Sequence, residues 1–145
     1  MLVSPAMDAP FRIYVVACIV LCLQLLALGG WTGAVRLSRK KYVSPEDAKA
    51  FKGSAVDAED PEVQRVKRAH LNALENAVPF IVVGAFYIPS ANKQGALAYC
   101  VTFVAARLLH SVFYLWGKQP WRTLMFIVGT ACTVGMAVQV LMHLS

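Results

Sequence analysis

Three polar side chains stand at helical spacing where a charged segment runs into an apolar one. Arg68, Asn72 and Glu75 fall at i, i+4 and i+7, so on one helix they form a single stripe. The chain continues from them into the apolar run IVVGAFYI. Charges at membrane depth cost about 2.5–3.5 kcal/mol each and normally face a bundle interior or a water-filled cavity. The stripe is therefore predicted to be a binding surface.

A second polar group lies farther along the chain, again inside apolar segments. Arg107, His110 and Tyr114 fall at i, i+3 and i+7 of one predicted helix, and Arg122 begins the next apolar run. Arg36 closes the first apolar run of the chain. If consecutive helices are antiparallel, all of these residues except Arg107 gather in the same half of the bundle as the first stripe.

The two deepest charges, Glu75 and Arg107, are expected to form an ion pair between helices, which would offset the burial of both. Such a pair could also serve only to hold the helices together. Taken singly, Arg36 and Arg122 fit head-group anchors at helix ends, and Tyr114 fits an interfacial aromatic residue. Their occurrence together at one depth favours a site.

The chemistry of this set points to a small zwitterion with more acidic than basic groups. Glutathione fits, because it offers two carboxylates to the arginines, an ammonium to Glu75, and a thiol whose ionisation a nearby arginine favours. An anionic lipid head group satisfies the same physics. No metal site is expected, since the cysteines lack metal-ligand spacing with a histidine and fit small buried hydrophobic residues: Cys18, Cys22, Cys100 and Cys132.

The elements that must position these residues are membrane-spanning helices. The chain is 58% hydrophobic and 15% charged, whereas soluble domains carry about 45–50% apolar and about 25% charged residues. We predict an all-α, integral membrane four-helix bundle in a single domain over residues 1–145, with membrane lipids around it. The predicted spans lie at about 11–35, 69–88, 95–116 and 121–144, and the polar loop lies at 36–68.

Local signals refine this outline. Ser44, followed by Pro45-Glu46-Asp47, predicts a short helix through about Phe51, and Asp60-Pro61-Glu62 predicts a second helix start. Lysine and arginine concentrate in the first and third loops, which places those loops and the site on the cytosolic side. The net charge of +6 follows from this topology, so no nucleic-acid partner is expected.

Three runs of the sequence resemble the MAPEG family of membrane-associated proteins in eicosanoid and glutathione metabolism: VRLSRKKYVSPEDAKAF, DPEVQRVKRAHLNALENAVPF, and ARLLHSVFYL followed by PWR. The resemblance extends from about Gly33 to the end of the chain. The resemblance is to the branch of the family that includes glutathione transferases and a prostaglandin E synthase. Within this branch, the run HLNALEN and Phe126 are closer to the pattern of the transferases. It implies a homotrimer with glutathione bound between subunits, in the endoplasmic reticulum or a bacterial inner membrane.

The resemblance also implies roles for individual residues. Glu75 would hold the glutathione ammonium, and Arg36 of the neighbouring subunit would bind a carboxylate. Arg122 would be the catalytic residue that stabilises the thiolate. Asp47 corresponds to a loop acid near the pocket. The remaining residues that would bind glutathione are Arg68, Asn72, His110 and Tyr114.

Three positions depart from the synthase pattern. Leu71, Thr123 and Phe126 stand where the resemblance would place an arginine, a serine and a tyrosine, which disfavours prostaglandin isomerase activity. The expected function is a membrane glutathione S-transferase that acts on lipophilic electrophiles, with reduction of lipid hydroperoxides as a related activity. The alternatives are a glutathione-dependent isomerase and a non-catalytic lipid-binding membrane protein of the same fold.

Overall fold

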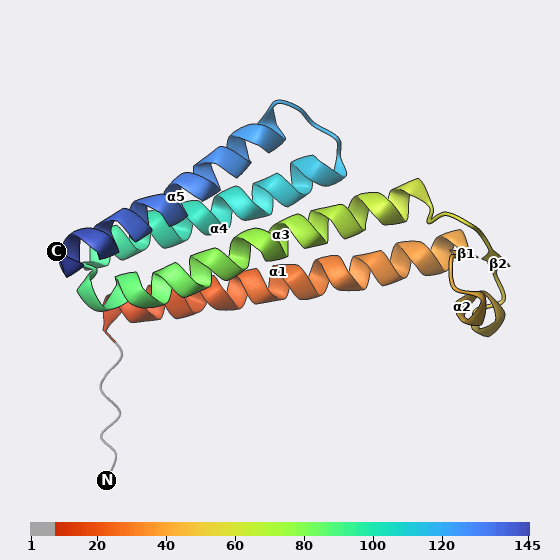
Figure 1. Cartoon of the computed structure of the whole chain (residues 1–145), viewed down its shortest axis with the longest axis horizontal. Coiled ribbons are helices and arrows are strands. Elements are labelled where there is room, and N and C mark those ends of the chain that lie inside the picture. Colours follow the sequence, from red (N-terminus) through yellow and green to blue (C-terminus); the bar gives the residue numbers. More distant parts are fainter. Residues whose placement is uncertain (1–7) are drawn as a thin grey trace, which may run out of the picture.

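The computed structural model describes residues 8–145 and contains four long helices that run side by side (Figure 1). These helices are α1 (Ala9–Arg39), α3 (Pro61–Tyr87), α4 (Lys93–Leu115) and α5 (Trp121–Leu144). All four are long and apolar enough to cross a membrane. The predicted all-α, multi-pass architecture is therefore confirmed, while the predicted single domain includes residues 1–7, which lie outside the described part.

Within residues 8–145, four of the five α-helices start where a side chain caps a free N–H group, and α5, which follows Pro120, is the exception. Asp8 accepts a hydrogen bond from the backbone of Phe11 at the start of α1, and Asn92 accepts one from Gly95 at the start of α4. Ser44 caps the short helix α2 (Pro45–Ala50), and Asp60 caps α3. The two helix starts predicted within the polar loop are thus confirmed.

The polar loop is shorter than predicted because α1 and α3 both continue into it. α1 ends at Lys40, whose φ of 50° is left-handed, and α3 begins eight residues before the predicted span. A two-residue parallel pair, β1 (Lys41–Tyr42) with β2 (Ser54–Ala55), was not predicted. Gly53 permits this pairing, since a Cβ there would lie 2.4 Å from the Tyr42 ring.

At one end of the bundle, α1 and α3 extend farther than α4 and α5 (Figure 1). Figure 1 shows that α1 and α3 project past the turn between α4 and α5, and that α2, β1 and β2 sit at the tip. We call this projecting part, residues 36–67, the α1–α3 extension. The four-helix part of the bundle and the extension therefore place polar side chains in different surroundings.

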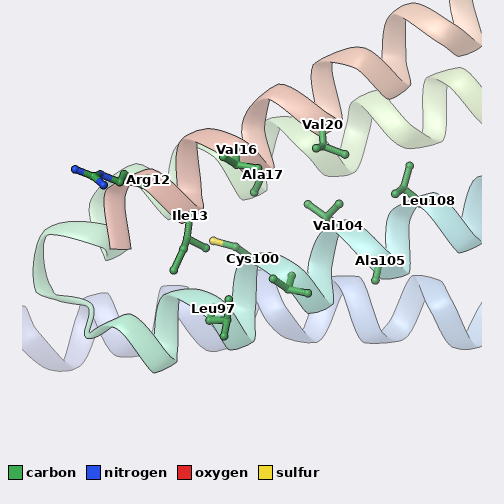
Figure 2. A pocket seen from close by; sticks show the side chains of 11 residues that line it. Arg12, Ile13, Val16, Ala17, Val20, Leu97, Cys100, Val104, Ala105 and Leu108 are labelled. Atoms are coloured by element: carbon green, nitrogen blue, oxygen red, sulfur yellow. The ribbon is translucent and has the colours of Figure 1, made fainter. Parts of the chain in front are cut away.

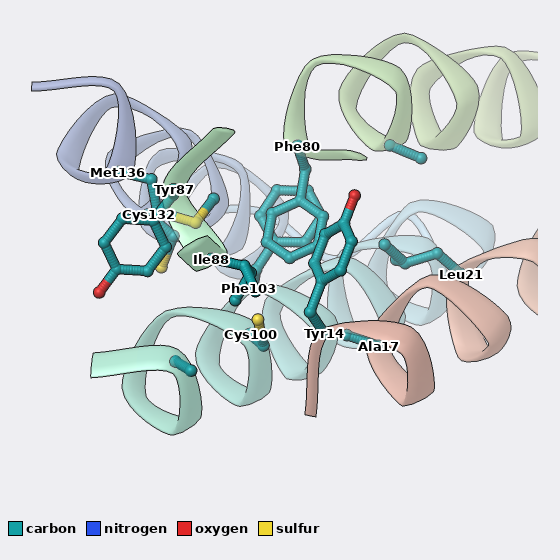
Figure 3. Packing of buried hydrophobic residues seen from close by; sticks show 12 residues of the cluster. Tyr14, Ala17, Leu21, Phe80, Tyr87, Ile88, Cys100, Phe103, Cys132 and Met136 are labelled. Carbon is teal, nitrogen blue, oxygen red and sulfur yellow. The ribbon is translucent and has the colours of Figure 1, made fainter. Parts of the chain in front are cut away.

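An aromatic core at the opposite end fixes the helices against one another (Figure 3). Phe80 of α3 and Phe103 of α4 stack with ring centroids 3.9 Å apart, and the Tyr14 hydroxyl of α1 donates to the Ile81 carbonyl at 2.6 Å. Gly84 lets the Tyr14 ring approach α3, because a Cβ there would lie 2.6 Å from that ring. This packing sets how α1 and α3 are rotated toward α4. Of the four cysteines predicted to be buried, Cys100 and Cys132 lie in this cluster, whereas Cys18 is half-buried and Cys22 is exposed on α1, so the prediction is wrong for Cys22.

Candidate functional site

The most deeply buried charge is Arg107 on α4, which is 1% exposed. Its Nη2 donates to the Asn72 side-chain oxygen at 2.5 Å and to the Asn72 carbonyl at 3.3 Å. The predicted Glu75–Arg107 ion pair is wrong. Three positions along α3 turn a side chain by about 60° around the helix axis, so Asn72 faces α4 while Glu75 is exposed.

A glutamine of α1 joins the same polar network. The Gln24 amide nitrogen donates to the Arg107 carbonyl at 3.0 Å and to the Ser111 hydroxyl at 2.7 Å. Hydrogen bonds between membrane helices of this kind stabilise helix association. We call Gln24, Asn72, Arg107 and Ser111 the Arg107 network. Gln24 was not among the predicted site residues, although an amide in the middle of an apolar run was the available signal.

The Arg107 network is not fully satisfied. Arg107 Nε and Nη1, together with His110 Nε2, are buried without a hydrogen-bond partner among the described residues. Buried polar groups in native structures are nearly always bonded, so each exception asks for an explanation. Two unpaired guanidinium nitrogens, which carry three N–H groups, and an imidazole nitrogen form a set that can bind an anionic or dipolar group.

Next to the network, His110, Tyr114 and Arg122 lie together as predicted. The His110 Nδ1 is 2.9 Å from the Arg122 carbonyl, which links α4 to the first turn of α5. The Arg122 guanidinium lies 4.7 Å from the centre of the Tyr114 ring, a cation–π distance. Phe126 closes the other side, with its ring 6.1 Å from His110. We call these four residues the Arg122 cluster.

Gln119 also contacts this cluster, and sequence reasoning missed it. When its amide oxygen faces Arg122, that oxygen accepts from Arg122 Nη2 and Nε at 2.6 and 3.2 Å, and its nitrogen donates to Thr123. The five-residue connection between α4 and α5 gave no periodic signal that could have pointed to it. The contacts hold the guanidinium of Arg122 in one orientation.

A separate ion-pair group lies in the α1–α3 extension. Glu59 accepts from Arg36 Nη2 at 2.5 Å and from Lys67 Nζ at 2.7 Å. Burial alone would raise the pKa of Glu59, but the hydrogen bonds from Lys67 and Arg36 outweigh it and hold the pKa below its ordinary value. We call these three residues the Glu59 group. Sequence reasoning assigned no role to Glu59, because a loop acid carries no spacing signal.

The remaining predicted ligands face outward within one chain. Arg68 is exposed and donates to the Gln64 side chain at 2.8 Å, one turn earlier on α3. Glu75 is also exposed, although it lies within the apolar part of α3. A single chain therefore brings Asn72 to Arg107 and gathers His110, Tyr114 and Arg122 in the adjoining cluster, but it does not bring Arg36, Arg68 or Glu75 to them.

Two hollows adjoin the Glu59 group. One measures about 460 Å³ and has Arg36, Asp47, Glu59 and Lys67 among its lining residues. The other measures about 410 Å³ and is lined in part by Glu59, Lys67 and Arg68. Asp47, predicted to lie near the pocket, thus shares a hollow with Arg36. Glu59 and Lys67 line both hollows and stand between them.

A third hollow has a different character. It is a groove of about 480 Å³ between α1 and α4 near the N-terminal end of α1, lined almost entirely by apolar side chains such as Val16, Cys100 and Val104. Figure 2 shows Arg12 at its end, with the guanidinium directed away from the groove. None of the predicted site residues lines it. Within residues 8–145 no group of three or more histidine, cysteine, aspartate or glutamate residues could hold a metal ion.

Comparison with known proteins accounts for nearly the whole chain. Residues 14–142 match the MAPEG family. Microsomal glutathione S-transferase 1 of Homo sapiens is 35% identical over 141 residues, covering 92% of this chain and 90% of that protein. The protein of the same name from Rattus norvegicus is 38% identical over 125 residues, covering 81% of this chain and 80% of that protein.

The prostaglandin E synthases are a second kind of relative. Prostaglandin E synthase of Homo sapiens is 32% identical over 141 residues, covering 95% of this chain and 90% of that protein. The family match covers nearly all of the four long helices and includes the Arg107 network, the Arg122 cluster and the Glu59 group. The chain belongs to the MAPEG family.

Proposed function

We propose that the protein is a membrane glutathione S-transferase, which joins the glutathione thiolate to lipophilic electrophiles dissolved in the bilayer. The proposal is supported by the relatives named microsomal glutathione S-transferase 1, which are 35–38% identical to this chain. The same thiolate would also reduce lipid hydroperoxides. The single observation that carries the proposal is the Arg122 cluster, in which a guanidinium is held over the Tyr114 ring while its backbone carbonyl contacts His110, a residue with a buried, unpaired nitrogen.

In this proposal the site is completed by other copies of the chain. Glu75 is exposed at membrane depth, where an uncovered carboxylate is unfavourable. A homotrimer would cover it, with Glu75 binding the glutathione ammonium and Arg36 of the neighbouring subunit binding a carboxylate. Further contacts to glutathione would come from Arg68, Asn72, His110 and Tyr114. The concentration of basic residues at this end of the bundle supports a cytosolic orientation for the site.

Arg122 would carry the chemistry. Its positive charge lowers the pKa of a thiol placed against it, which raises the fraction of thiolate at neutral pH. The thiol proton passes to water, because a guanidinium is already fully protonated. The sulfur then forms a bond to the electrophilic carbon while the leaving group departs with the electron pair. Tyr114 and Gln119 keep the guanidinium in place during this step.

The test is ultraviolet difference absorbance of the detergent-purified protein on adding glutathione, which reports the thiolate. We expect a thiolate band in the wild type and in Lys118→Ala, a matched loss of a basic residue in the same turn. In Arg122→Ala we expect no band and a fall in kcat/KM of about 10²–10³-fold, as for other preorganised electrostatic groups. A full rate in Arg122→Ala would contradict the mechanism. Absence of both band and calorimetric glutathione binding in the wild type would favour the lipid-binding alternative.

The 32–33% identity to prostaglandin E synthases supports a second candidate, a glutathione-dependent isomerase. Phe126 argues against this candidate, because the resemblance places a tyrosine at this position. The Phe126 ring lies beside His110 and Arg107 and has no hydroxyl. A hydroxyl is therefore missing from this side of the Arg122 cluster. Turnover of a prostaglandin endoperoxide at a rate above that of an aromatic electrophile would favour the isomerase.

A further inference from the structure

Glu59 holds Arg36 in the way that a ligand carboxylate would. Each of its two oxygens accepts from a different cation, Arg36 at 2.5 Å and Lys67 at 2.7 Å. Charge-assisted bonds of this length are typical of arginine and lysine bound to a carboxylate. The residue proposed to bind a carboxylate of glutathione is thus already bound to a carboxylate of the same chain.

The contact is exchangeable rather than buried. The Glu59 side chain is 17% exposed, that of Arg36 36% and that of Lys67 52%. Ion pairs at this exposure are weak and are screened by salt. Only the backbone of Glu59 is anchored, through its carbonyl, which accepts from the Gln64 side chain at 2.9 Å. The Glu59 carboxylate can therefore leave Arg36 without disturbing the start of α3.

The position of Glu59 also matters. It stands with Lys67 between the hollow that contains Arg36 and the hollow that contains Arg68. Glu59 lines both hollows, so its negative charge would repel an anionic ligand in either of them. If Glu59 moved off Arg36, its second oxygen could remain with Lys67, so the displaced carboxylate would keep one partner.

We propose that Glu59 is an internal competitor: it occupies Arg36 when the site is empty and must release Arg36 before a carboxylate of glutathione can bind there. This inference rests on the proposed function. It makes Glu59 a residue that sets glutathione affinity without touching the reacting atoms. Substituting it should therefore change binding and leave the chemical step alone.

The experiment is calorimetric titration of the full-length, detergent-purified protein with glutathione. Glu59→Gln keeps the shape of the side chain and removes its charge, so we expect Kd to fall about fivefold, the size of one exposed ion pair. The rate at saturating glutathione should not change. Glu62→Gln is the matched control, because Glu62 pairs with Arg39 in the same region and should leave Kd unchanged. Glu59→Ser also removes the charge and should lower the Kd for glutathione, as Glu59→Gln does.

A double-mutant cycle separates competition from a general charge effect. In an Arg36→Ala background, Glu59→Gln should give a smaller gain in affinity, since there is no guanidinium left to release and only the repulsion by Glu59 is removed. An equal gain in both backgrounds would overturn the inference. An unchanged Kd in Glu59→Gln, with binding retained, would overturn the inference but not the proposed function. Loss of glutathione binding and of the thiolate band in every protein tested, wild type included, would overturn both.

Discussion

Arg107 and Arg36 each donate to a side-chain oxygen at 2.5 Å, yet they are held in opposite ways. Arg107 is 1% exposed and bonds to the neutral amide of Asn72, with two of its nitrogens unpaired among the described residues. The Arg36 side chain is 36% exposed and bonds to the carboxylate of Glu59. Equal distances therefore do not imply equal energies or equal roles.

The surroundings explain the difference. In the low-dielectric bundle a guanidinium interacts strongly with any partner and is expensive to leave unpaired, while at the extension water weakens every ion pair. The Arg107 network is consequently a fixed part of the fold that joins α1, α3 and α4. The Glu59 group is a more exposed and weaker set of contacts, in which we propose that a ligand carboxylate replaces Glu59. The predictions below follow this contrast, from the largest expected effect to the smallest.

Removing the partner of Arg107 should have the largest effect. Asn72→Ala removes the short bond and leaves Arg107 Nη2 with only the 3.3 Å bond to the backbone carbonyl of residue 72. We expect a loss of about 2–3 kcal/mol in the free energy of unfolding in detergent. Arg107→Met with Asn72→Ala should lose less than Asn72→Ala alone, because the unpaired charge is gone. Additive losses in this cycle, measured by thermal unfolding, would show that the two residues are not coupled.

Loosening the link between α1 and α4 should have a smaller effect. Gln24→Leu removes two hydrogen bonds, which at membrane-protein values amount to about 1 kcal/mol together. Gln139→Leu is the comparison, since Gln139 makes one bond, to the Tyr99 hydroxyl at 2.7 Å. Unfolding in detergent should rank the Gln24 variant as the less stable of the two. The opposite order would mean that the Arg107 network does not depend on α1.

Breaking the exposed contact should hardly change stability. Arg36→Ala is expected to lower the free energy of unfolding by less than about 1 kcal/mol at low salt, and by less still at high salt. Arg12→Ala, at the other end of the bundle, serves as the control for loss of a surface arginine. A salt-independent loss as large as that of Asn72→Ala would remove the distinction between the two regions.

The smallest effect should appear on acidification. The pKa of Glu59 is depressed in the folded protein, so its contribution is present above its unfolded pKa and is lost as pH falls through the lower, folded value. Stability should therefore decline below about pH 4. Part of this decline should be missing in Glu59→Gln. Thermal unfolding measured at a series of pH values checks this. If the wild type and Glu59→Gln lose stability equally on acidification, Arg36 and Lys67 do not stabilise the Glu59 carboxylate.

The features that sequence predicted well are the ones set by local patterns. Apolar runs and capping residues such as Asp60 predict the helices, because burial and free N–H groups act within one segment. His110, Tyr114 and Arg122 could be placed together since helical spacing and a short turn leave little freedom. Their proposed roles toward glutathione stay predictions.

The features that sequence missed depend on how segments are turned toward each other. The choice between Asn72 and Glu75 as the partner of Arg107 is made by the rotation of α3, which the packing of Tyr14 on Gly84 helps to set. Glu59 was missed because the path of the loop before α3 decides which cations it reaches. Neither arrangement leaves a periodic trace in the sequence.

The unequal lengths of the helices have a consequence for how the protein sits in its membrane. α4 has 23 residues and spans about 35 Å, which is close to the thickness of a bilayer core, whereas α1 has 31 residues and spans about 46 Å. The surplus on α1 carries Arg36 and Arg39 into the head-group layer. Anionic phospholipids attract such residues with about 1 kcal/mol per charge, so the lipid composition of the membrane would itself regulate how readily Arg36 exchanges partners.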